Sequence, residues 1–229
     1  MAPGSGRVSP PAAVVFDLDG VVVDSEPAIR ASLNAALLSI GESSVDDSEL
    51  RSIIGPPLLA GLSWLLEVRG LSSGLAGRLL DEYRAHYARH AMSGTHTYAG
   101  IDELLDALLA AGIPLAVATS KPAQFSIPIL EGLGLAMAFA VVEAPDATAV
   151  TEGKAETLGR VVGRLGLRPG CGALMVGDRR SDMEAAVLHG LVPVGVLWGY
   201  GTANELRSAG AEFLLKKPGQ LQAVVGIAT

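Results

Sequence analysis

The sequence predicts an α/β protein built on a doubly wound, Rossmann-like parallel sheet, with a helical insert after the first strand. Short apolar segments rich in β-branched residues alternate with amphipathic helical segments. The gap between the first two strands is much longer than a crossover helix needs. Polar residues also follow several strands directly, at the edge where open α/β sheets form their ligand crevice.

The predicted strands are short, apolar and bounded by polar or turn residues. They cover residues 12–16, 114–119, 139–142, 173–176, 192–197 and, more weakly, 212–215. Most are separated by predicted helices, over 100–111, 123–133, 155–165 and 182–189. Strands that alternate with helices in this way form a parallel sheet.

The first gap predicts an inserted subdomain. The first strand ends at residue 16 and the second begins at residue 114, whereas a βαβ unit needs only about 30 residues. Helical spacing recurs over 28–40, 48–53, 58–68 and 75–92. We therefore predict a wholly helical cap over 25–97, between core segments 12–24 and 98–229. The turn Gly55-Pro56-Pro57 either faces the site or only separates two helices.

Composition narrows the class of protein. The chain of 229 residues is 49% hydrophobic and 18% charged, enough apolar material for a large core. A net charge of -7 without a basic tract argues against nucleic acid as a partner. The single cysteine, Cys171, excludes an internal disulfide. Residues 1–11 are expected to form a loose tail, and no stretch reaches the ~20 apolar residues of a membrane span, so a cytoplasmic protein is expected.

Polar side chains follow the predicted strands at several places. They are Asp17 and Asp19 after the first strand, Thr119, Ser120 and Lys121 after the second, Lys154 before helix 155–165, and the run Gly177-Asp178-Arg179-Arg180-Ser181-Asp182 after the fourth. Singly, each has an ordinary role as a helix cap or a surface residue, and Arg179 and Arg180 are expected to be exposed. Together, carboxylates suit Mg²⁺, and hydroxyls and a lysine suit phosphate oxygens. One carboxylate could attack phosphorus while a second moves a proton.

At these residues the chain resembles the haloacid dehalogenase-like hydrolases. It is most similar to their capped phosphatases, related to phosphoglycolate phosphatase and β-phosphoglucomutase. The matching motifs are Asp17-Leu18-Asp19-Gly20-Val21, Thr119-Ser120-Lys121-Pro122, Lys154, the run from Gly177 to Asp182, Tyr98-Ala99-Gly100 and Trp198-Gly199-Tyr200-Gly201. The resemblance covers about residues 12 to 215. One departure is Ala155, where relatives usually carry proline after the lysine.

The resemblance implies a Mg²⁺-dependent reaction at four aspartates. Asp17 would be the nucleophile that takes up the phosphoryl group, and also a metal ligand. Asp19 would be the general acid and base, with its backbone carbonyl on the metal. Asp178 would bind Mg²⁺ directly, and Asp182 would hold the metal directly or through water.

The resemblance also implies a phosphate-binding set. Thr119 and the backbone amide of Ser120 would hold phosphate oxygens. Lys154 would neutralise charge on the nucleophile and on the phosphoryl group. The expected partner is a small phosphorylated metabolite, not nucleic acid or a membrane, bound by a monomer or a homodimer.

The sequence leaves several functions open. A phosphatase acting on a small phosphomonoester is favoured over a phosphomutase, which would need cationic cap residues. The cap arginines form no cluster in the sequence: they are Arg30, Arg51, Arg69, Arg78, Arg84 and Arg89. A dehalogenase is disfavoured because those enzymes lack the second aspartate, here Asp19. A non-catalytic binding protein of this fold would be expected to have lost Asp17 or Asp19.

Overall fold

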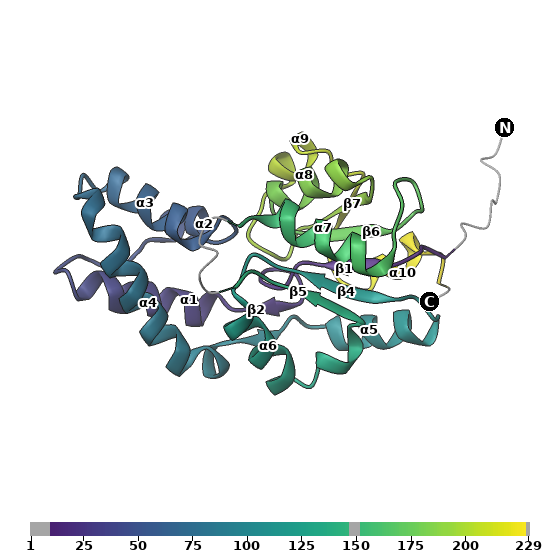
Figure 1. Ribbon diagram of the computed structural model, residues 1–229, viewed down its shortest axis with the longest axis horizontal. Helices are drawn as coiled ribbons and strands as arrows, with labels where there is room; N and C mark the ends of the chain where they lie inside the picture. The colour runs from purple at the N-terminus through teal and green to yellow at the C-terminus, as the bar shows by residue number, and fades with distance from the viewer. Residues whose placement is uncertain (1–9, 147–151, 228–229) are drawn as a thin grey trace.

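The computed structural model describes residues 10–146 and 152–227, so residues 1–9 of the predicted tail lie outside the described part. Its core is a six-stranded sheet, with the helices of the cap to one side (Figure 1). The strands are β1 (Val14–Phe16), β4 (Leu115–Ala118), β5 (Val141–Glu143), β6 (Leu174–Gly177), β7 (Val192–Val196) and β8 (Phe213–Leu215). They pair in the order β5-β4-β1-β6-β7-β8, each pair parallel. The predicted fold class is confirmed.

The central strand β1 is buried on both faces. Val14 and Phe16 belong to a hydrophobic cluster with α5 (Ile101–Ala110), α6 (Ala123–Gly132) and α10 (Gln220–Val224). Val15 belongs to a second cluster with α7 (Lys154–Leu165) and α8 (Arg180–His189). Figure 1 shows α7 and α8 above the sheet and α5 and α6 below it. Burial on both faces explains why the strand reads as a continuous apolar run.

The cap follows β1 and consists mainly of α1 (Glu26–Leu38), α2 (Asp47–Ile53), α3 (Leu58–Val68) and α4 (Ala76–His90). Single 3₁₀ turns lie at Ser73–Leu75 and Met92–Gly94. The helices bury one apolar face each, and their side chains continue the hydrophobic cluster of the core. Among the helices of the described ranges, none is long and apolar enough to cross a membrane.

The prediction of a wholly helical cap was wrong at its base. There, β2 (Val23–Asp24) and β3 (His96–Thr97) form an antiparallel pair where the chain enters and leaves the cap. Two residues per strand are too few to show an alternating pattern. Two short helices, α9 (Ala203–Ser208) and α10, were not predicted from the sequence, because five or six residues hold too little helical periodicity.

Candidate active site

The site lies where β1, β4 and β6 end at one edge of the sheet. The strands are in register, since Phe16 aligns with Val117 on one side and Val176 on the other. Asp17 follows β1 directly, and its backbone N–H donates to the carbonyl of Val176 at 2.9 Å. Thr119 and Asp178 follow the neighbouring strands in the same way. Parallel pairing therefore brings residues about a hundred positions apart to one edge, as the sequence predicted.

A buried acidic cluster forms the centre of this edge. Asp17, Asp178 and Asp182 each offer a carboxylate oxygen, and these oxygens lie within 4.8 Å of one another. Lys154 Nζ lies 2.5 Å from Asp17 Oδ1 and 3.0 Å from Asp182 Oδ1. It also donates to the carbonyl oxygen of Ala118 at 2.9 Å. Lys154 is thus a buried cation among carboxylates, and the ordinary interpretation as a surface lysine is wrong.

The acidic cluster shifts the protonation equilibria of its members. Burial raises the pKa of Asp17 to about 7, although Lys154 opposes this shift. Burial, together with the carboxylates of Asp182 and Asp17, raises the pKa of Asp178 well above its usual value. For Lys154, burial alone would lower the pKa, but the charges of Asp17 and Asp182 outweigh it and raise the pKa. One lysine therefore does not offset the negative charge gathered here.

The residues of this cluster fit a divalent cation held by oxygen ligands. Asp178 Oδ1 is buried and has no hydrogen-bond partner among residues 10–146 and 152–227. Asp182 Oδ2 accepts the backbone N–H groups of Asp178 and Arg179 at 3.1 and 2.9 Å, which fixes this carboxylate at the start of α8. A buried, unpaired carboxylate oxygen is costly unless a cation compensates it, and carboxylates are typical ligands of Mg²⁺.

A second ion pair joins Asp19 to the cap. Asp19 Oδ1 accepts hydrogen bonds from Ser25 Oγ and from Lys121 Nζ, the latter at 2.8 Å. Lys121 Nζ also donates to the hydroxyl oxygen of Tyr87 on α4 at 2.7 Å, and its backbone N–H donates to Thr119 Oγ1 at 3.1 Å. The sequence motif contained Lys121 but gave it no role, and Tyr87 was missed. Nothing in the sequence places Tyr87 beside Lys121, because they lie on separate elements.

Two glycines permit the close packing around Asp178. Gly20 has a φ of +84°, and a Cβ there would lie 2.3 Å from Asp178 Oδ2. A Cβ on Gly199 would lie 2.3 Å from the carbonyl oxygen of Gly20 and 2.4 Å from Asp178 Oδ2. The backbone N–H of Tyr200 donates to the same Asp178 oxygen at 2.7 Å. The Trp198-Gly199-Tyr200-Gly201 motif therefore holds the Asp178 carboxylate in place.

We expect Gly199→Ala to weaken metal binding and to destabilise the protein by about 1–3 kcal/mol, because the added methyl displaces the Asp178 carboxylate or the Gly20 backbone. Isothermal titration with Mg²⁺ and thermal unfolding with and without Mg²⁺ measure both effects. Gly163→Ala in α7 is the control: within the described residues, and apart from its own stretch of helix backbone, no atom lies within 4 Å of its Cβ position, so neither quantity should fall. Unchanged Mg²⁺ affinity in Gly199→Ala would contradict the packing role of this glycine.

A cavity extends from this edge of the sheet toward the cap. Asp17, Asp19, Thr119, Ser120 and Lys121 line it from the core. The Gly55-Pro56-Pro57 turn lines it from the cap, so this turn faces the site.

Arg179 also lines the cavity, and the prediction that it is exposed was wrong. Its side chain is 17% exposed, with Nε 3.2 Å from Glu205 Oε1. Its Nη1 donates to the carbonyl oxygen of Arg51 in the cap at 2.6 Å. The guanidinium is thereby held between core and cap, whereas Arg180 is exposed as expected.

Residues 14–196 match the family described as haloacid dehalogenase-like hydrolase. The chain belongs to this family, and its relatives place it among the phosphatases of the family.

Three curated relatives illustrate the range of activities. The chain is 28% identical to a phosphoglycolate phosphatase of Pectobacterium atrosepticum, over 93% of this chain and 92% of the relative. It is 31% identical to a 5'-nucleotidase of Pseudomonas aeruginosa, over 85% of this chain and 86% of the relative. It is 34% identical to the tyrosine-protein kinase PtkA of Mycobacterium tuberculosis, over 85% of this chain and 65% of the relative.

The solved structures agree with the fold. The crystal structure of a predicted phosphatase from Clostridium acetobutylicum superposes with a TM-score of 0.85 and is 31% identical in sequence. The match covers 95% of this chain and 99% of that chain. The similarity therefore includes the cap as well as the sheet.

Proposed function

We propose that the chain is a Mg²⁺-dependent phosphatase that hydrolyses a small phosphomonoester through an aspartyl-phosphate on Asp17. The observation that carries this proposal is the buried cluster of Asp17, Asp178 and Asp182, two of which pair with Lys154, at the end of a cavity that Asp19 also lines. In this proposal, residues 25–97 act as a cap over a core formed by 12–24 and 98–229.

Asp17 is the proposed nucleophile. Its Oδ1 accepts the backbone N–H of Leu18 at 2.7 Å and lies 2.5 Å from Lys154 Nζ. Both contacts hold the carboxylate in one orientation, and the Lys154 cation would balance negative charge there before and after Asp17 attacks phosphorus. A bond would form between an Asp17 carboxylate oxygen and phosphorus while the bond from phosphorus to the alcohol oxygen breaks.

Asp19 is the proposed general acid and base. It would give a proton to the departing alcohol oxygen, and would then take a proton from the water that attacks the phosphorus of the aspartyl-phosphate. That attack releases inorganic phosphate and restores the Asp17 carboxylate. The contacts of Asp19 with Ser25 and Lys121 hold its carboxylate on the wall of the cavity.

The remaining groups of the site would position the phosphoryl group. Thr119 and the backbone amide of Ser120 are proposed to bind its oxygens, since both residues line the cavity. Asp17, Asp178, Asp182 and the backbone carbonyl of Asp19 would hold Mg²⁺, which when bound supplies positive charge to the phosphoryl oxygens.

Phosphate release across a panel of phosphorylated metabolites, with Mg²⁺ and with EDTA, tests the proposed function. We expect release from one or a few small phosphomonoesters, and loss of at least roughly 100-fold in rate when EDTA removes the metal. The same rate in EDTA would contradict the metal dependence. No release from any ester by the folded protein would contradict the phosphatase itself.

A phosphomutase has less support than a phosphatase. Its bisphosphate intermediate would need additional cations, but cap arginines are held by cap groups: Arg30 pairs with Glu26 and Asp47, and Arg69 pairs with Glu49. Of the six cap arginines, all within the described ranges, Arg84 alone lines the cavity. Conversion of β-glucose 1-phosphate to the 6-phosphate would support the mutase instead.

A further inference from the structure

The part of the cavity formed by the cap is largely apolar. One face of α4 contributes Leu80, Tyr83, Arg84 and Tyr87, which are spaced three and four residues apart. Ile29 of α1 also lines the cavity, as do apolar residues near the ends of α2 and α3. A substrate held at Asp17 by its phosphoryl group would therefore place its alcohol portion against aliphatic and aromatic carbon.

The aromatic part of this wall is fixed by its own packing. Tyr83 stacks on Tyr87 with ring centroids 5.4 Å apart, and Phe125 of α6 meets Tyr87 edge to face at 5.2 Å. Tyr87 is further held by Lys121 Nζ, which lies 4.8 Å from its ring centroid. A wall held in this way offers a preformed apolar surface, and binding to it requires little reordering.

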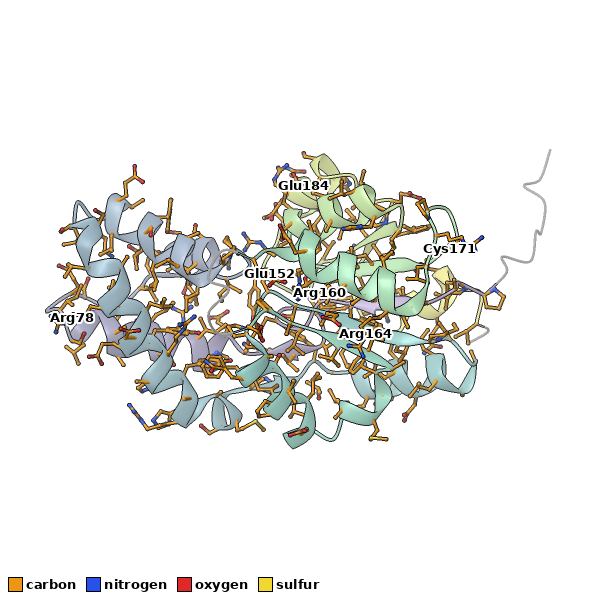
Figure 2. The ribbon with its side chains drawn as sticks, in the orientation of Figure 1. Arg78, Glu152, Arg160, Arg164, Cys171 and Glu184 are labelled. Carbon is orange, nitrogen blue, oxygen red and sulfur yellow. The ribbon has the colours of Figure 1, made fainter. Side chains whose placement is uncertain are left out.

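The charges on the cavity wall do not favour a second anionic group on the substrate. Lys121 is paired with Asp19, and Arg179 is held by Glu205 and the Arg51 carbonyl. Glu152 also lines the wall, and its negative charge is paired with Arg160. Figure 2 shows Glu152 and Arg160 on the side of the core toward the cap, where they form an ion pair. Among the cap arginines, all within the described ranges, Arg84 alone lines the cavity, so the effect of its charge on substrate preference has to be measured.

From these observations we infer that the preferred substrate is a monophosphate ester of an uncharged, apolar alcohol, and not of a hydroxy acid or a second phosphate. This inference rests on the proposed function, since it concerns the alcohol side of the same site. Its physical basis is that each methylene buried against an apolar wall strengthens binding about fourfold. A carboxylate placed against the same aliphatic and aromatic carbon would lose its hydration without gaining a hydrogen bond from that surface.

Isobutyl phosphate and phosphoglycolate form a matched pair for the test, because the two methyl groups of one replace the two carboxylate oxygens of the other. We expect kcat/KM to be at least tenfold higher for isobutyl phosphate, and to rise along methyl, ethyl and propyl phosphate. Equal values, or a preference for phosphoglycolate, would overturn the inference while leaving the phosphatase intact. The preference should persist in Arg84→Met; a preference that appears only in this variant would also overturn the inference.

Binding measurements separate this inference from the proposed function. Isothermal titration of both esters into Asp17→Asn, which retains the cavity, reports the preference without turnover. Tighter binding of isobutyl phosphate supports the inference even if neither ester is hydrolysed by the unaltered protein, an outcome that would contradict only the phosphatase. Tighter binding of phosphoglycolate would overturn the inference of an apolar alcohol.

A matched pair of leucine variants tests whether the alcohol portion of the substrate contacts the cap wall of the cavity. Leu58 lies half-buried on the cavity wall at the start of α3, so Leu58→Asn should lower the preference for isobutyl phosphate roughly tenfold. Leu38→Asn makes the same change at a side chain that is 75% exposed and does not line the cavity, and should leave the preference unchanged. An unchanged preference in Leu58→Asn would overturn the proposed contact with the cap wall.

Discussion

Asp17→Asn is expected to lower kcat by roughly 10⁴-fold or more, because the amide cannot attack phosphorus and no other group replaces a lost nucleophile. The variant should still fold. Its side chain keeps nearly the same shape, and it removes a charge that burial already disfavours, as the raised pKa of Asp17 shows. Steady-state phosphate release measures the first effect and circular dichroism the second.

Asp106→Asn provides the control for this substitution. It makes the same change at an exposed position on α5, outside the cavity, and should leave both kcat and stability within experimental error. Retained turnover in Asp17→Asn would rule out Asp17 as the nucleophile. Loss of turnover together with unfolding would instead show that the residue is needed for the fold.

Lys154→Met should destabilise the metal-free protein by about 3–5 kcal/mol, because the substitution leaves the buried carboxylates of Asp17 and Asp182 without the cation that pairs with them. Lys154 is 4% exposed, so water cannot replace it. Mg²⁺ should restore part of the lost stability, since it binds the folded cluster and neutralises it. Urea unfolding with EDTA and with Mg²⁺ measures both.

The control is Lys217→Met, which removes an exposed lysine and should change stability by less than about 0.5 kcal/mol. Asp178→Asn should have the opposite effect on the metal-free protein, since it removes one of the crowded carboxylates, while abolishing the response to Mg²⁺. If Lys154→Met unfolds at the same urea concentration as the unaltered protein, the proposed charge balance of the cluster is wrong.

The sequence predicted the sheet edge well because the relevant signals are local. The apolar run before Asp17 and the polar run after β6 each mark a strand end without knowledge of the rest of the chain. Parallel pairing then brings these ends together as a consequence of topology. The long helical insert was equally visible, since its four main helices carry apolar residues at helical spacing.

What the sequence missed depends on contacts between distant segments. The resemblance placed Lys154 in the site, but its burial follows from ion pairs with Asp17, after β1, and Asp182, in α8, and no local pattern distinguishes it from a surface lysine. The inward position of Arg179 depends on the Arg51 carbonyl in the cap. The contact of Tyr87 with Lys121 likewise requires the cap to lie over the core.

Acid-quenching the protein during turnover, followed by mapping of phosphorylated peptides by mass spectrometry, tests whether Asp17 carries the phosphoryl group. The predicted result is one phosphoryl group on the peptide that contains Asp17, formed at the rate of a pre-steady-state burst and absent from Asp17→Asn. Phosphoryl transfer to another residue, or turnover with neither burst nor phosphorylated peptide, would rule out an aspartyl-phosphate on Asp17.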